Sequence, residues 1–112
     1  MTRTMQIRLG AKQVVRSDSS IGGYKPGLTP ADYWERGRYE WVFNADRALA
    51  CDEVELISSG EDGEVVLAVA TVEAVFKIGG RYGIEGKLIE DDPRIGSVTT
   101  HPHPSRNPIA YF

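Results

Sequence analysis

The 112-residue sequence has a single cysteine, Cys51, and so cannot form an intrachain disulfide or a cysteine-rich zinc site. Such cysteine usage is typical of a reducing compartment, and we expect a cytoplasmic protein. No apolar run approaches the roughly 20 residues that span a bilayer, so we expect no membrane partner. The first fifteen residues carry scattered charges without an apolar centre, so we expect no secretory signal there.

The sequence also lacks the motifs of the common hydrolases and nucleotide-binding enzymes. It contains no GxSxG, no P-loop and no HExxH. Internal repeats and low-complexity segments are absent as well. We therefore assign no catalytic residue and expect no cofactor.

Charge is distributed unevenly along the chain, behind a net charge of −3 and a pI near 5.3. Residues 1–50 hold eight basic and five acidic residues, whereas residues 51–92 hold three basic and eleven acidic residues. The basic half could face a polyanion. The acidic stretch could equally be the solvated face of strands. The acidic pI argues against tight, non-specific nucleic-acid binding, but it is compatible with recognition of one base or a short strand.

Short apolar runs that alternate with polar residues indicate a mainly β fold of the α+β class, in a single domain over residues 1–112. We expect strands over residues 5–15, broken at Gly10, and over residues 39–43, 51–58, 65–76, 81–89 and 109–112. Residues 59–63 read as a hairpin turn. Residues 29–37 and 44–50 are expected to form short helices, the first capped by Thr29 and ended by Gly37. Five to seven strands with many glycines favour a small closed or nearly closed β-barrel.

Three segments of this pattern resemble the PUA-like superfamily, which includes the PUA, ASCH and EVE domains. The first carries the aromatic pairs Tyr33-Trp34 and Tyr39-Glu40-Trp41. The second is ALACDEVEL at residues 48–56, where Cys51 stands at a position that is usually glycine in the family. The third is VVLAVATV at residues 65–72. The resemblance implies a small pseudo-β-barrel with a concave site that often binds RNA or a modified or flipped base, and it does not imply catalysis.

Four aromatic residues lie within nine positions of the basic half, interleaved with arginines. Bases stack on aromatic rings, and arginine neutralises phosphate or stacks as a plane, so this combination is suited to a single-strand or flipped-base pocket. The alternative is that the alternating rings of Tyr39, Trp41 and Phe43 belong to the core. Asn44 could bond a base edge or cap the following helical turn.

His101 and His103 lie two residues apart in a proline-rich segment, where both imidazoles would share one side of an extended chain. They could line the mouth of a pocket with Ser105, Arg106 and Asn107, or belong to a surface tail. No third ligand is evident in the sequence, so we predict no metal site. The predicted ligand-binding residues are Tyr33, Trp34, Arg36, Arg38, Tyr39, Trp41, Asn44, Arg47, His103 and Arg106.

The resulting hypothesis is a non-catalytic module that binds a nucleic acid or a modified nucleobase through an aromatic–arginine pocket. A second hypothesis is a protein-interaction module whose acidic face docks a basic partner. That face would comprise Asp52, Glu53, Glu55, Glu61, Asp62 and Glu64. A third is a small ASCH-like hydrolase that uses Lys77 or Glu73 in a cleft.

Overall fold

The computed structural model describes residues 2–10, 14–15, 21–39, 41–58, 64–103 and 108–112. Over these residues the fold is mainly β with two short helices, as predicted. The elements are β1 (Thr4–Leu9), β2 (Val14–Val15), β3 (Ile21–Gly22), α1 (Pro30–Gly37), α2 (Ala45–Leu49), β4 (Glu53–Ser58), β5 (Val66–Thr71), β6 (Ala74–Ile78), β7 (Arg81–Glu85) and β8 (Ile109–Tyr111). Within the described residues neither helix is long and apolar enough to cross a membrane.

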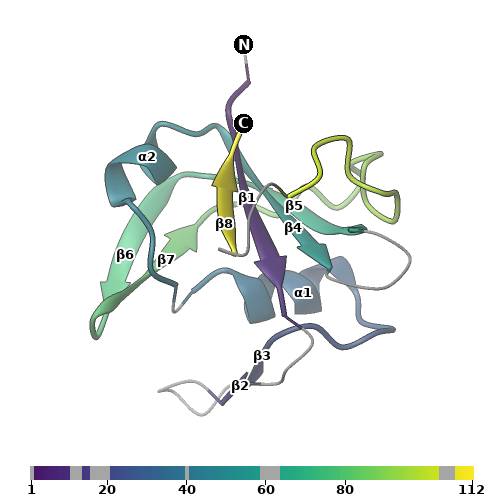
Figure 1. Ribbon diagram of the computed structural model, residues 1–112, viewed down its shortest axis with the longest axis horizontal. Helices are drawn as coiled ribbons and strands as arrows, with labels where there is room; N and C mark the ends of the chain where they lie inside the picture. Colours follow the sequence, from purple (N-terminus) through teal and green to yellow (C-terminus); the bar gives the residue numbers. More distant parts are fainter. Residues whose placement is uncertain (1, 11–13, 16–20, 40, 59–63, 104–107) are drawn as a thin grey trace.

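A four-stranded sheet in the order β5-β4-β1-β8 forms the centre of the molecule (Figure 1). β1 runs parallel to β4, whereas β8 and β5 are antiparallel to their neighbours. β6 pairs with β7 and β2 with β3 in two separate ribbons. The expected closed or nearly closed barrel is not formed by the described strands, because the outer strands β5 and β8 do not pair with each other.

Residues 65–76, expected as one long strand, are divided between the central sheet and a ribbon. β5 ends at Thr71, and β6 begins at Ala74. Between them the Val72 N–H donates to the Asp52 carbonyl oxygen at 3.1 Å and the Glu73 N–H to the Glu85 carbonyl oxygen at 2.9 Å. These bonds direct the chain from β4 towards β7, so the apolar run supplies strands to two sheets.

Residues 39–43 do not form the predicted strand over their described positions. Trp41 alone pairs with Tyr82, through two backbone hydrogen bonds of 3.0 and 2.8 Å. The Trp41 indole N–H donates to the Gly37 carbonyl oxygen at 2.7 Å, which ties this segment back to the end of α1. Glu40 lies outside the described residues.

Helix α1 covers one face of the central sheet and forms the main core with it (Figure 1). It begins as predicted, with a capping box between Thr29 and Asp32 and with Pro30 in its first turn. Its aromatic side chains pack against the side chains of β1 and β4 that point to this face. These residues are Met5, Ile7, Leu9, Tyr33, Trp34, Val54 and Leu56.

The opposite face of the sheet carries Gln6 of β1 and Glu55 of β4, and it is also covered. Gln6 is 0% exposed and Glu55 is 2% exposed. Residues 89–103, at the right of Figure 1, cross over this face, and Ile89 and Ile95 pack against a cluster centred on Ile57. Because apolar and acidic residues alternate along β4, its glutamates could have formed a solvated face. The later segment instead encloses Glu55.

Gly86 provides a stability test of the crossing between β5 and β7. A Cβ atom at this position would collide with the backbone oxygen of Thr71, which cannot move without disturbing β5. We predict that Gly86→Ala lowers the free energy of unfolding by about 1–3 kcal/mol, as overpacking does. Urea unfolding followed by circular dichroism measures this change.

The matched control is Gly80→Ala, because nothing lies within 4 Å of a Cβ atom there. Equal stability of the two variants would contradict the close approach at Gly86.

Candidate functional site

A network of polar side chains lies between the central sheet and residues 99–103; we call Gln6, Glu55, Glu64, Thr99 and His103 the polar layer. The Gln6 amide donates to Glu55 Oε1 at 3.1 Å and to the His101 carbonyl oxygen at 2.8 Å. The Thr99 hydroxyl donates to the same Glu55 oxygen at 2.6 Å. A buried polar group without a hydrogen bond costs about 1–3 kcal/mol, and these bonds avoid that cost for the groups that they join.

His103 completes the polar layer from the far end of the chain. Its Nδ1 lies 2.8 Å from Gln6 Oε1, and its backbone N–H donates to Glu64 Oε1 at 2.8 Å. Because an amide oxygen only accepts hydrogen bonds, Nδ1 of His103 carries the proton. This predicted site residue therefore fastens the chain to the sheet.

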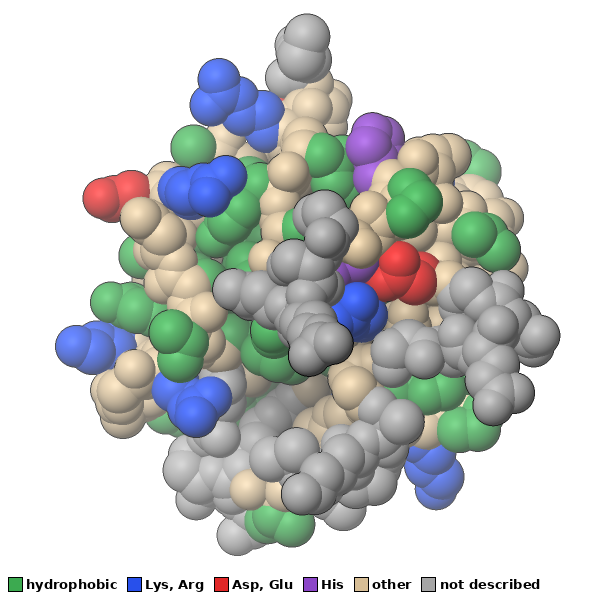
Figure 2. All heavy atoms as spheres, in the orientation of Figure 1, with side chains coloured by type: hydrophobic (Ala, Val, Ile, Leu, Met, Phe, Trp, Pro, Cys, Tyr) green, Lys and Arg blue, Asp and Glu red, His purple; other side chains and the backbone are tan. Residues whose placement is uncertain are grey.

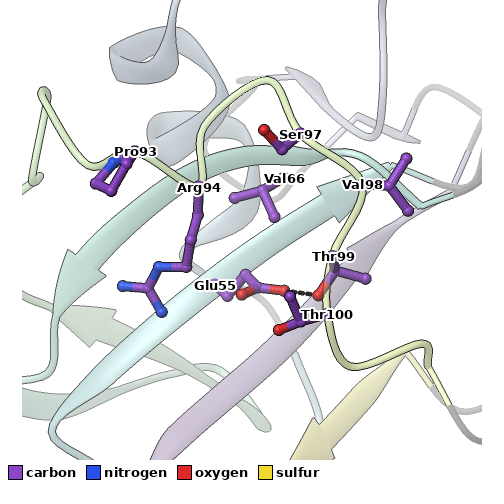
Figure 3. A pocket seen from close by; sticks show the side chains of 8 residues that line it. All are labelled: Glu55, Val66, Pro93, Arg94, Ser97, Val98, Thr99 and Thr100. Carbon is purple, nitrogen blue, oxygen red and sulfur yellow. Dashed lines mark hydrogen bonds between the residues drawn. The ribbon is translucent and has the colours of Figure 1, made fainter.

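A pocket of about 220 Å³ opens above Glu55 (Figure 3). Its lining residues are Glu55, Val66, Pro93, Arg94, Ser97, Val98, Thr99 and Thr100. Glu55 lies at the floor beneath the threonines, whereas Ser97, Val98 and Thr100 are exposed at the rim. Both hydrogen bonds that Glu55 receives from described residues end on Oε1, so Oε2 is left without a donor there.

Arg94 anchors the segment that forms this pocket. Its guanidinium donates to both Glu53 oxygens, at 2.6 and 3.0 Å, and to both Asp92 oxygens, at 2.9 and 2.8 Å. These bonds lower the pKa of Asp92, chiefly through the side-chain hydrogen bond, and raise the pKa of Arg94. Since its donors are engaged by two carboxylates, Arg94 serves to hold residues 92–94 on β4.

A second hollow lies at the edge of the sheet beside α2, in two adjoining parts that share Arg47 and Tyr111; we call it the Arg47–Tyr111 cleft. One part, of about 370 Å³, is lined by Thr2, Arg3, Arg47, Ala50, Cys51, Tyr111 and Phe112. The other, of about 320 Å³, is lined by Val42, Phe43, Asn44, Arg47, Ile109, Ala110 and Tyr111. The guanidinium carbon of Arg47 lies 4.1 Å from the centre of the Tyr111 ring, as in a cation–π contact.

The Arg47–Tyr111 cleft is positively charged. Figure 2 shows basic side chains over α2 and the start of the chain. Within the described residues Arg3 and Arg47 form no ion pair with a carboxylate, whereas Arg8 pairs with Glu64. The Cys51 thiol donates to the Arg47 carbonyl oxygen at 3.3 Å, and burial raises its pKa, so it is not poised as a nucleophile.

The predicted aromatic pocket is not found where the sequence placed it. Tyr33, Trp34 and Tyr39 are 5%, 7% and 9% exposed, and Tyr33 and Trp34 belong to the main core. The Tyr33 hydroxyl donates to the Lys25 carbonyl oxygen at 2.6 Å, an internal bond. Trp34 was predicted to bind a ligand, but it lies on the buried face of α1 and packs in the core.

The neighbouring arginines also have internal partners. Arg36 donates to the Gly23 carbonyl oxygen at 3.4 Å. Arg38 pairs with Glu35 and Glu85, with shortest distances of 3.3 and 3.6 Å. Trp41 is partly buried and bonded to Gly37. The structure thus uses Arg36, Arg38 and Trp41 to join α1 to nearby segments.

Two predicted site residues do line an accessible hollow, namely Asn44 and Arg47. Asn44 Oδ1 accepts from the Arg47 backbone N–H at 3.1 Å, so the helix cap is confirmed. Arg106 lies outside the described residues. His101 stacks on Phe112 with ring centres 3.8 Å apart. Among the residues with described positions, no group of three potential ligands is arranged to hold a metal.

The alternative sites are also placed by the structure. Glu53 and Glu64 of the proposed acidic face are engaged by Arg94 and Arg8, and Glu55 is buried. Asp52 accepts a hydrogen bond from the Arg3 backbone N–H at 2.9 Å, and Glu61 and Asp62 lie outside the described residues.

The residues proposed for a hydrolase, Glu73 and Lys77, are both exposed on or beside β6. The nearby Thr71 hydroxyl accepts a hydrogen bond from the Lys87 N–H at 2.9 Å and has a structural role.

Sequence reasoning missed Arg3, Tyr111 and Phe112 as members of one site. Arg3 and Tyr111 come from opposite ends of the chain and are brought together because β8 pairs with β1. The last strand was predicted, but its partner was not, and no local signal identifies it.

Comparison of the chain with models of protein families, with curated proteins and with solved structures finds no match.

Arg94 gives a pH test of the anchor on β4. Because its bonds depress the pKa of Asp92, the stabilisation is present above the ordinary aspartate value of about 4 and is lost as the pH falls through the folded-state value. We predict that Arg94→Gln lowers the free energy of unfolding at pH 7 by about 2 kcal/mol. The variant should also lose less stability than the wild type on acidification, as urea unfolding from pH 7 to pH 2.5 would show.

Arg81→Gln, which removes a charge from the exposed start of β7, serves as the control. Parallel pH curves for wild type and Arg94→Gln would refute the role of the anchor.

Proposed function

We propose that this chain is a non-catalytic module that binds single-stranded nucleic acid, and that it holds a base and its phosphate in the Arg47–Tyr111 cleft. The observation that carries the proposal is the pair of guanidinium groups, Arg3 and Arg47, which have no carboxylate partner within the described residues and flank the rings of Tyr111 and Phe112. The resemblance of residues 33–75 to PUA-like domains favours the same class of ligand.

The aromatic surface of the cleft is suited to stacking. Phe112 is 36% exposed, and the His101 ring lies against it at an interplanar angle of 9°. The Arg47 guanidinium over Tyr111 provides a second planar group. Stacking of a base on such a surface contributes about 1–3 kcal/mol and tolerates any sequence.

Polar recognition would come from Asn44 and from the arginines. Asn44 Oδ1 is used in the helix cap, which leaves the amide N–H groups of this exposed side chain able to donate to a base edge. Arg3 and Arg47 would neutralise phosphate, with a dependence on salt that such contacts always bring. With a net charge of −3, the chain is suited to a short contact rather than to coating a duplex.

The cleft supports binding without catalysis. Among the described residues that line it there is no carboxylate, and the neighbouring His101 imidazole is stacked on Phe112. The one thiol, Cys51, is buried with a raised pKa. Whether the base is modified, and whether the strand is RNA or DNA, are outcomes of the test below.

Arg47→Gln tests the site. We predict that this variant binds fluorescein-labelled single strands about tenfold or more weakly than the wild type, because it loses both a phosphate contact and a stacking plane. The salt dependence of binding should also decrease by about one phosphate contact. Fluorescence anisotropy with RNA and DNA oligonucleotides, some carrying modified bases, at two salt concentrations measures both effects.

Arg81→Gln is the matched control, since it removes the same charge from the β6–β7 ribbon, and urea unfolding checks that each variant is folded. Binding by Arg47→Gln and Arg3→Gln at wild-type affinity would exclude this cleft. Absence of binding by the wild type to every strand at low salt would overturn the proposed function.

A further inference from the structure

We propose that the pocket above Glu55, the Glu55 pocket, binds a small organic cation: an ammonium or amidinium group carried on an apolar body. This site lies on the face covered by residues 89–103, and its lining shares no residue with the Arg47–Tyr111 cleft. The proposal does not rest on nucleic-acid binding.

The first argument is the state of Glu55. It is 2% exposed and forms no ion pair within the described residues. Gln6 and Thr99 hold Oε1, while Oε2 receives no hydrogen bond from them or from any other described residue. Oε2 is not one of the fully enclosed oxygen atoms without a partner, so it is open to the pocket, where a donor from a bound ligand can form a charge-assisted hydrogen bond with it.

The second argument is the charge around the pocket. Among the described residues that line it, the basic one is Arg94, and its donors are taken by Glu53 and Asp92. One guanidinium group therefore accompanies the three carboxylates of Glu53, Glu55 and Asp92, and it bonds only to Glu53 and Asp92. The excess negative charge favours a cation over an anion or a neutral ligand.

The third argument is the shape and lining of the pocket. Val66, Pro93 and Val98 form apolar walls, and the exposed hydroxyl residues Ser97 and Thr100 stand at the rim (Figure 3). A volume of about 220 Å³ accommodates a single ring or a short alkyl chain. The described residues hold no group of three potential metal ligands, so an organic cation suits the pocket better than a metal ion.

The orientation of Glu55 is fixed before a ligand arrives. Gln6 comes from the central strand and Thr99 from the covering segment, and both bond to the same oxygen atom. Because these two bonds come from separate elements, they hold the whole carboxylate in place, including its second oxygen. The side chain therefore loses little conformational entropy when a ligand binds.

Benzamidinium is the probe that tests the proposal, with neutral benzamide of nearly the same shape as its partner. We predict that benzamidinium binds and shifts the amide NMR signals of residues 97–100, whereas benzamide binds at least about tenfold more weakly, since a hydrogen bond to a charged group is lost. Glu55→Gln, which retains the size of the side chain, should weaken the binding of benzamidinium by a similar factor.

Glu73→Gln is the charge-matched control on an exposed position and should bind as the wild type does. If Glu55→Gln does not fold, Val98→Trp provides a second test, because it fills the pocket from an exposed position and should abolish binding in a folded protein. Equal affinity for benzamidinium and benzamide, no NMR response to benzamidinium, or wild-type affinity in folded Glu55→Gln or folded Val98→Trp would overturn the proposal.

Discussion

The hydrogen bonds that Gln6 and Thr99 donate to one oxygen of Glu55 join the central sheet to the segment that covers it. Gln6 lies on β1, the central parallel partner of β4, and Thr99 comes from the chain after β7. Without a donor on each side, Glu55 would be a buried carboxylate with too few partners, and the covering segment would lose its polar contact with the sheet. The anchors at Arg94 and His103 lie on either side of this point along the same segment.

Closure of that face decides where ligands can reach the protein. The core side of the sheet is filled by α1, and the other side is covered by residues 89–103. Over the described part of the chain, accessible hollows lie at the edge beside β8 and α2, where Arg3 and Arg47 meet aromatic rings, and above Glu55. The two proposed sites therefore differ in charge: the Arg47–Tyr111 cleft is expected to bind an anionic ligand, and the Glu55 pocket a cationic one.

Local features of the fold were predictable because they depend on neighbouring residues. The caps at Thr29 and Asn44 and the strands at residues 53–58 and 109–111 follow from capping chemistry and alternation. The burial of Glu55 was not predictable, because alternation shows which side chains share a face but not whether a segment 44 residues later covers it. For the same reason the arginines near α1 suggested a phosphate site, although Arg38 pairs with Glu85 of β7.

A double-mutant cycle on Gln6→Met and Thr99→Val tests the central claim most directly, with the free energy of unfolding as the readout. Since both side chains donate to the same carboxylate oxygen, their effects should not add: we predict a coupling energy of about 1 kcal/mol or more. Effects that add to within about 0.3 kcal/mol would show that the two bonds are independent, and would contradict the account of a single junction between sheet and covering segment.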